Sequence, residues 1–161
     1  MNTVNPYLKQ YQKNQIETAS PGQVLIMLYD GAIQFLIKAK TALEEKDFQK
    51  FFNSIESCQR IILEFMDTLD MEIGGELAKN LYKLYEYLYD ALGRANMKKD
   101  VKKIDEVLKH LKALRETWQK AITISNAEKN TSLMDNTLDK YESNDNDDDY
   151  SDDEEDDGDE E

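Results

Sequence analysis

Apolar residues recur with a helical period in four stretches of the chain, which short polar connections separate. The stretches cover residues 21–45, 48–69, 76–95 and 100–122, and a Gly-Gly turn precedes the third. Helices of this length joined by short loops favour antiparallel neighbours. The pattern predicts an all-α protein: an up-down-up-down four-helix bundle over residues 20–122.

The starts of the predicted helices carry capping residues. Ser20 is placed as the N-cap of the first helix, Pro21 fits the first helical position, and Gln23 completes a Ser-x-x-Gln capping box. Asp47 and Asp100 stand where the second and fourth helices begin. We expect all three caps to form.

The first predicted helix is more apolar than a helix with one buried side requires. A rotation of about 100° per residue divides its apolar side chains into two stripes. The first stripe is assigned to the core and consists of Leu25, Leu28, Ala32, Phe35, Leu36, Ala39 and Leu43. The second lies about 100° away and consists of Ile26, Ile33 and Ile37.

The third predicted helix repeats this excess of apolar surface. Its core-facing side is assigned to Leu77, Leu81, Leu84, Leu88, Ala91, Leu92 and Ala95. Ala78, Tyr82, Tyr85 and Tyr89 widen that side to about half of the helix circumference. A thick core, a covering arm or fifth helix, or a homodimer would each explain the excess. The remaining explanation is a groove for an amphipathic helix or extended segment of another protein, which tyrosine suits because its hydroxyl stays hydrated.

The two ends of the chain differ from the bundle. Residues 1–19 are polar with sparse large residues, and are expected to form a mobile arm or a short helical segment. Residues 123–161 are expected to be a linker and a disordered acidic tail, with room for at most one short extra helix. Acidic and basic residues number 19 each up to Leu138, whereas the last 23 residues hold 15 acids and one lysine.

This charge distribution and the absence of targeting signals exclude several functions. The bundle is electrically balanced and has no basic patch of the kind that nucleic acid requires. No apolar run is long enough to span a membrane, and no signal peptide is visible, so a cytoplasmic protein is expected. Cys58 is the single cysteine and is expected to be a small buried side chain.

Candidates for chemistry are few. His110 is the single histidine and Lys112 lies close to it, so a histidine phosphotransfer module is the alternative hypothesis; an edge residue of the helix is the simpler interpretation. One histidine cannot supply the paired Glu-x-x-His motifs of a di-iron bundle. No phosphate-binding loop follows Gly74-Gly75, and the spaced aspartates of the tail lack the glycine of a calcium loop. We expect no catalytic residues, no metal and no cofactor.

The sequence also resembles a known family. The stretch from Tyr7 to Lys40, with Tyr11, the Thr18–Pro21 turn and Leu28-Tyr29-Asp30-Gly31-Ala32, is similar to the bacterial flagellar secretion chaperones, FliS. The IGGELAKNLYKLYEYLYDALGRAN segment and Trp118 support the resemblance, which extends to about Ile122. The acidic tail has no counterpart in the family.

The resemblance implies a non-enzymatic chaperone. In this family the disordered C-terminal segment of flagellin wraps around the bundle and displaces the N-terminal arm, which prevents premature filament assembly. The loaded chaperone then docks on the cytoplasmic domain of the export gate. The positions that match the docking residues are Leu8 and Tyr11, and the candidates for flagellin binding are Ile26, Ile33, Ile37, Tyr82, Tyr85 and Tyr89. A monomer or weak homodimer that neither binds nucleic acid nor inserts into a membrane is expected.

Overall fold

The computed structural model of the chain describes residues 6–7, 9–10, 13 and 19–144, with side chains described as far as Thr137. The chain divides into two compact units, residues 1–121 and 122–161. The described part is all-helical and contains four long helices, as predicted. These are α2 (Pro21–Glu44), α3 (Phe48–Thr68), α4 (Met71–Lys98) and α5 (Val101–Asn144). None of the described helices is long and apolar enough to cross a membrane.

The predicted helix caps are confirmed. Ser20 Oγ accepts the backbone N–H of Gln23 at 3.3 Å, and the Gln23 side chain accepts the backbone N–H of Ser20 at 3.0 Å. Asp47 and Asp100 each accept the backbone N–H three residues further on, at 3.1 and 3.2 Å. Caps depend on neighbours in sequence, which is why the sequence alone located them.

The third predicted helix starts earlier than expected. α4 begins at Met71, because the Asp70 carboxylate accepts the N–H groups of Glu72 and Ile73 at 3.0 and 2.9 Å and starts a helical turn of its own. Gly75 then interrupts the helix with φ 50° and ψ −129°, a backbone conformation that suits glycine. The predicted turn is therefore present, inside the helix instead of before it.

The fourth predicted helix ends later than expected. We placed its end near Ile122, where the regular apolar pattern stops, but α5 continues to Asn144. The segment from 101 to 144 contains no glycine or proline to end a helix. The side chains described beyond Ile122 are exposed, so this part of α5 keeps its helical conformation without packing against the core.

The predictions of a mobile N-terminal arm and of a disordered acidic tail stay predictions, whereas residues 123–144, expected to be mainly a linker, belong to α5. Residues 145–161, which hold most of the acidic run, lie outside the described residues, as do most of residues 1–18. Among the described residues of the arm, residues 6–7, 9–10 and 13 are helical and Ala19 is not.

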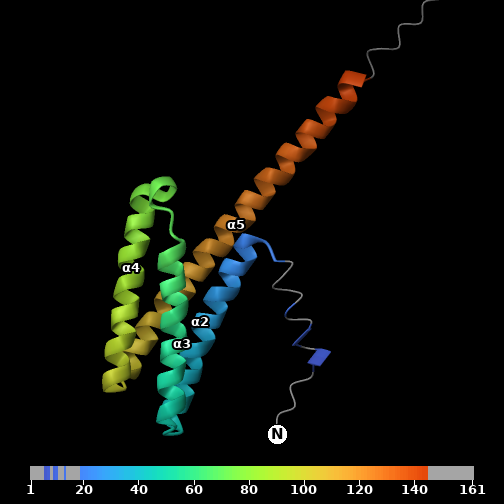
Figure 1. Ribbon diagram of the computed structural model, residues 1–161. Helices are drawn as coiled ribbons and strands as arrows, with labels where there is room; N and C mark the ends of the chain where they lie inside the picture. Colours follow the sequence, from blue (N-terminus) through green and yellow to red (C-terminus); the bar gives the residue numbers. More distant parts are fainter. Residues whose placement is uncertain (1–5, 8, 11–12, 14–18, 145–161) are drawn as a thin grey trace, which may run out of the picture. The chain divides into compact units, whose positions relative to one another are not determined.

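The core of the first unit receives side chains from all four helices. α2, α3 and α4 lie side by side (Figure 1), and the start of α5 contributes Ile104, Val107 and Leu111. The largest fully buried side chains are Tyr29, Tyr85, Phe51, Phe65, Leu36, Ile55, Ile62, Leu88, Leu92, Ile104, Leu111 and Val107. Cys58 is fully buried as well, as expected.

The buried side of α2 differs from the predicted one. Ile26 and Ile33, assigned to a second stripe, are 8% and 7% exposed, whereas Leu28 and Phe35 are only partly buried. The buried arc is centred near Tyr29, which the prediction left out of the core. The arc is therefore rotated toward Ile26 and Ile33, and Leu28 and Phe35 lie at its edge.

Candidate functional site

Three aromatic rings meet where α2, α3 and α4 pack together. The Tyr29 and Phe65 rings are stacked with centroids 4.3 Å apart, and the Phe65 and Tyr85 centroids are 5.3 Å apart. The two tyrosine hydroxyl oxygens lie 2.6 Å apart, so one hydroxyl donates to the other within the core. Each hydroxyl is a polar group buried in apolar surroundings, and the pairing provides it with a hydrogen-bond partner.

Burial keeps both tyrosines of this pair protonated. Loss of hydration raises the pKa of Tyr29 well above its ordinary value, and the hydrogen bond with Tyr85 raises it further. Burial also raises the pKa of Tyr85, while its hydrogen bond with Tyr29 acts in the opposite direction. The pair is therefore neutral at physiological pH, which suits a structural role and not proton transfer.

The Leu28–Ala32 stretch connects α2 to every other helix of the bundle. Beside Tyr29, which contacts α3 and α4, Asp30 accepts two hydrogen bonds from the Arg115 guanidinium of α5; the Nη2–Oδ2 distance is 3.1 Å. A Cβ at Gly31 would lie 3.4 Å from Ile61 Cδ1, at van der Waals distance, so α2 and α3 approach each other closely at this glycine. These contacts join residues far apart in sequence, and periodicity alone did not indicate them.

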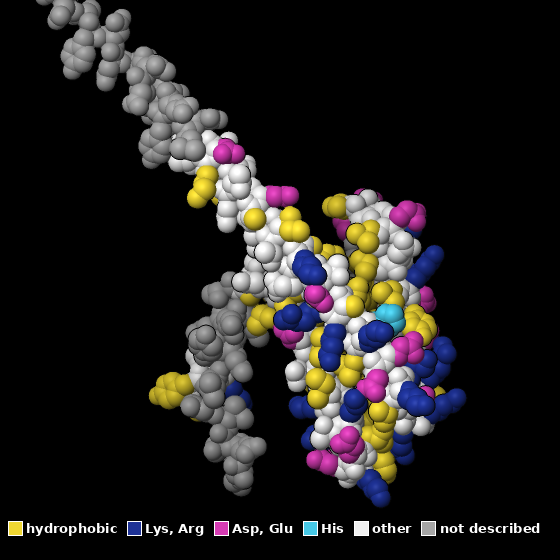
Figure 2. Space-filling model, turned by 180° about the vertical axis from the view of Figure 1, so that it is seen from behind, with side chains coloured by type: hydrophobic (Ala, Val, Ile, Leu, Met, Phe, Trp, Pro, Cys, Tyr) yellow, Lys and Arg dark blue, Asp and Glu magenta, His cyan; other side chains and the backbone are white. Residues whose placement is uncertain are grey.

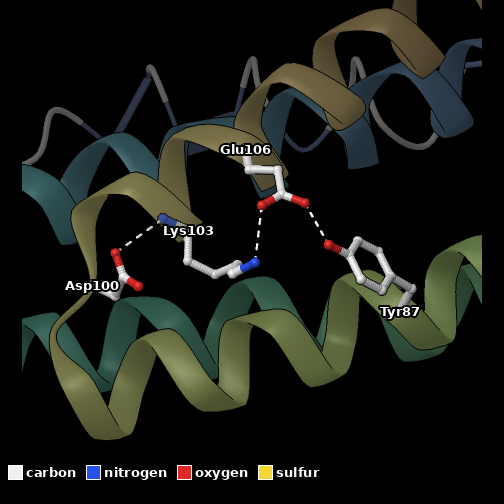
Figure 3. A network of polar contacts seen from close by, with 4 residues as sticks. All are labelled: Tyr87, Asp100, Lys103 and Glu106. Atoms are coloured by element: carbon white, nitrogen blue, oxygen red, sulfur yellow. Dashed lines mark hydrogen bonds and ion pairs between the residues drawn. The ribbon is translucent and has the colours of Figure 1, made fainter.

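Further polar contacts hold α5 on the bundle. Lys40 Nζ lies 2.6 Å from Asp105 Oδ1, which makes a second ion pair with α2. Glu106 accepts hydrogen bonds from the Tyr87 hydroxyl of α4 and from Lys103 Nζ, the latter at 3.0 Å (Figure 3). The bond from Tyr87 is the main cause that lowers the pKa of Glu106. These contacts are partly exposed and support the packing.

The predicted flagellin-binding residues fall into two groups. Ile26, Ile33 and Tyr85 are buried, with Tyr85 only 2% exposed. Ile37 and Tyr82 are 40% and 38% exposed. Tyr89 is half-buried, and its carbonyl oxygen accepts a hydrogen bond from the Gln59 side chain of α3 at 3.2 Å.

The structure exposes one apolar residue that the sequence assigned to the core. Leu77 is 64% exposed, and Leu81 and Leu84, on the same side of α4, are only partly buried. Figure 2 shows one face of the molecule, on which hydrophobic side chains reach the surface between charged ones. The bundle therefore keeps accessible apolar surface although its core is complete.

The two docking candidates, Leu8 and Tyr11, lie outside the described residues. His110 is half-buried, and its ring meets the Tyr87 ring edge-on with centroids 6.5 Å apart. These contacts are those of a packed surface residue and do not favour the phosphotransfer hypothesis. Among the described residues, no group of three or more His, Cys, Asp or Glu side chains is arranged to hold a metal ion.

Comparison with known proteins gives a consistent result. The model of the FliS family, described as "Flagellar protein FliS", matches residues 3–125. The chain is 36% identical over 118 residues to the flagellar secretion chaperone FliS of Bacillus subtilis (strain 168), covering 73% of this chain and 86% of the relative. Identity to the Salmonella typhimurium (strain LT2) chaperone FliS is 33% over 117 residues, covering 72% and 87%.

A solved structure described as a flagellar chaperone from bacteria shares the fold. Its TM-score is 0.61 at 24% identity, covering 73% of this chain and 96% of the other. The all-helical structure, the family match over more than half of the chain and the two relatives agree. The chain therefore belongs to the FliS family of flagellar secretion chaperones.

Proposed function

We propose that this chain is a cytoplasmic, non-enzymatic export chaperone that binds the disordered C-terminal segment of flagellin. Binding prevents premature polymerisation, and the complex is delivered to the flagellar type III export gate. The observation that carries the proposal is apolar surface left accessible on a bundle whose core is already filled. The names of the curated relatives, all flagellar secretion chaperones, give the class of client.

The exposed members of the predicted set are the best candidates for direct contact with flagellin. Tyr82, Tyr89 and Ile37 reach the surface to different extents, and the exposed Leu77 joins them on α4. Ile26, Ile33 and Tyr85 are buried and would shape this surface from below. Contact residues on both α2 and α4 suit a client that wraps around the bundle.

A wrapping client fits the physical character of this surface. A disordered segment loses conformational entropy on binding, so its affinity has to come from a large area of apolar contact. Tyrosine rings pack against such a segment, and their hydroxyls remain hydrated when the client is absent. The surface can therefore stay exposed in the free chaperone and still bind firmly.

We infer the up-down-up-down arrangement of the bundle from its loops and ion pairs. Asp30 and Lys40 of α2 pair with Arg115 and Asp105 of α5, so residue numbers rise along one helix as they fall along the other. This order supports opposite directions for α2 and α5. Short connections between successive helices support the same for the remaining pairs.

The proposed docking on the export gate uses the N-terminal arm. Leu8 and Tyr11 are its candidate contact residues, by their match to the family motif. Replacing both with alanine should reduce binding of the flagellin-loaded chaperone to the cytoplasmic domain of the gate and leave flagellin binding itself intact.

Titration of the full chain with a fluorescent peptide of the flagellin C-terminal segment tests the main proposal. We expect binding at micromolar or lower concentration, and about tenfold weaker binding for a Leu77→Ala/Tyr82→Ala double variant. Leu63→Ala is the matched control, because Leu63 is 41% exposed but lies on α3, outside the proposed surface.

Three outcomes would contradict this proposal. Failure of the wild-type chain to bind the peptide at micromolar concentration would exclude flagellin as the client. Equal losses in the control and in the double variant would show that the peptide binds elsewhere. A homodimer that buries Leu77 and Tyr82 in the absence of client, detected by sedimentation, would favour the structural alternative.

A further inference from the structure

The helix α5 continues beyond the part of the chain that the family explains. The family match ends at residue 125, and the helix runs without a break to Asn144. In the second unit, the described side chains from Thr123 to Thr137 are all exposed. The family match therefore covers only the first residues of this segment and leaves residues 126–144 without an assigned role. Exposed side chains of the segment can be reached by a partner.

One side of this segment carries an apolar stripe, which we call the seam: Ile124, Ala127, Thr131 and Met134. The spacing of three, four and three residues keeps the seam within about 80° of the helix circumference. Ile124 and Met134 are 59% and 69% exposed. Leu133 is 64% exposed but lies about 180° from Ile124, on the opposite side.

Negative charge borders the seam. Glu128 and Asp135 lie about 40° and 20° from Ile124 around the helix, whereas Lys129 lies about 140° away. The 17 residues that follow the helix, 145–161, contain 13 acidic residues and no lysine or arginine. An apolar strip with an acidic edge is therefore followed in sequence by a strongly acidic segment.

We propose that the seam is a docking site for a basic amphipathic helix of another protein. The apolar side of that helix packs along the seam, while its lysine and arginine side chains face Glu128 and Asp135. The net negative charge of residues 145–161 adds long-range attraction for a basic partner. Charge complementarity accelerates association and selects the partner. This proposal does not rest on flagellin binding, because the segment lies beyond the bundle residues discussed above.

A second copy of this chain fits the seam less well. The seam spans about ten residues, or about 15 Å of helix, so two copies would bury much less than the roughly 1,200 Å² of a stable interface. Each copy would also bring the same acidic edge and acidic segment. A basic partner adds charge attraction to the small apolar contact, which a second copy cannot do.

Fluorescence anisotropy with two synthetic peptides tests the proposal on the full chain. One peptide, about 18 residues long, carries leucine at heptad positions a and d and lysine beside them. The other has the same composition, scrambled so that the leucines surround the helix. We expect the amphipathic peptide to bind at least about tenfold more tightly than the scrambled one. The affinity of each peptide should decrease when the salt concentration is raised from about 50 mM to about 500 mM.

Matched variants locate the binding site. Ile124→Asp/Met134→Asp should abolish the preference for the amphipathic peptide. Leu133→Asp should retain it, because the same change is made at an equally exposed position on the opposite side of the helix. Deleting residues 145–161 should weaken the binding of both peptides by the same factor.

Several results would overturn the proposal. Equal binding of the two peptides would show attraction by charge alone, and absence of binding would exclude the site. A preference that survives in Ile124→Asp/Met134→Asp would place the peptide on the bundle. A dimer in sedimentation that this double variant disrupts would show that the seam binds a second copy.

Discussion

The hydroxyl oxygens of Tyr29 and Tyr85, 56 residues apart in sequence, lie 2.6 Å from each other in a largely apolar core. One hydroxyl donates to the other, the Trp118 side chain also hydrogen-bonds with both, and a hydrogen-bonding group left alone in such a place is costly. The pair therefore makes the stability of the bundle depend on two positions jointly.

Removing one hydroxyl should cost more than removing both. We expect Tyr29→Phe or Tyr85→Phe alone to lower the free energy of unfolding by about 1–2 kcal/mol, because the remaining hydroxyl loses its tyrosine partner and keeps only its interaction with the Trp118 side chain. The double variant should recover most of this loss. Urea unfolding of the four proteins measures the coupling, and strictly additive losses would contradict it.

Stability should fall at alkaline pH because of the same pair. Burial raises the pKa values of both tyrosines above the ordinary 10.0, so the folded state keeps protons that the unfolded state releases. The stabilisation is complete below about pH 10 and is lost as the pH rises above it. Above that pH, each tyrosine lowers the free energy of unfolding by up to about 1.4 kcal/mol for each pH unit. Urea unfolding between about pH 8 and pH 11 should show a shallower decline in Tyr29→Phe/Tyr85→Phe.

The thiol of Cys58 should be unreactive in the folded protein. It is fully buried, and burial raises its pKa from 9.0 to about 12, so little thiolate is present at neutral pH. Iodoacetamide should label Cys58 only after unfolding in urea, as followed by mass spectrometry. Rapid labelling of the native protein would show that α3 opens locally.

The backbone at Gly75 should be intolerant of any side chain. Its φ of 50° and ψ of −129° are strained for other residues, so Gly75→Ala should lower the free energy of unfolding by about 1–3 kcal/mol. Gly93→Ala is the control, because an added Cβ there would lie 3.7 Å from Gln59 Nε2, an ordinary contact. In the regular part of α4 this control should be neutral or slightly stabilising. Thermal melts of both variants test the difference, and equal effects would contradict the role of φ.

Local features of the fold could be predicted from the sequence. The caps at Ser20, Asp47 and Asp100 are contacts between neighbours in sequence, and periodicity identified the four helices. The predicted end of the fourth helix, near Ile122, is wrong because an apolar pattern indicates which residues pack and not where a helix stops. A segment without glycine or proline can continue as a helix in solvent, as α5 does to Asn144.

The candidate site was harder to predict. Helical angles gave the apolar arcs of α2 and α4 but not the neighbour that each arc meets, so Ile26 and Ile33 were taken for a second stripe and Leu77 for the core. Whether such a side chain is buried depends on the helices that pack against it. The Tyr29–Tyr85 and Asp30–Arg115 pairs join residues 56 and 85 positions apart, and no pattern within one helix indicates them.

The two ion pairs between α2 and α5 also discriminate against a misfolded alternative. Each helix carries its acid and its base ten residues apart, Asp30 and Lys40 on α2 and Asp105 and Arg115 on α5. If α5 packed in the reversed direction at the same height, acid would face acid and base would face base. Each pair stabilises the correct fold only modestly, since its side chains are partly exposed. Together they widen the difference in stability between the two packings, by attraction in the correct one and by repulsion in the reversed one.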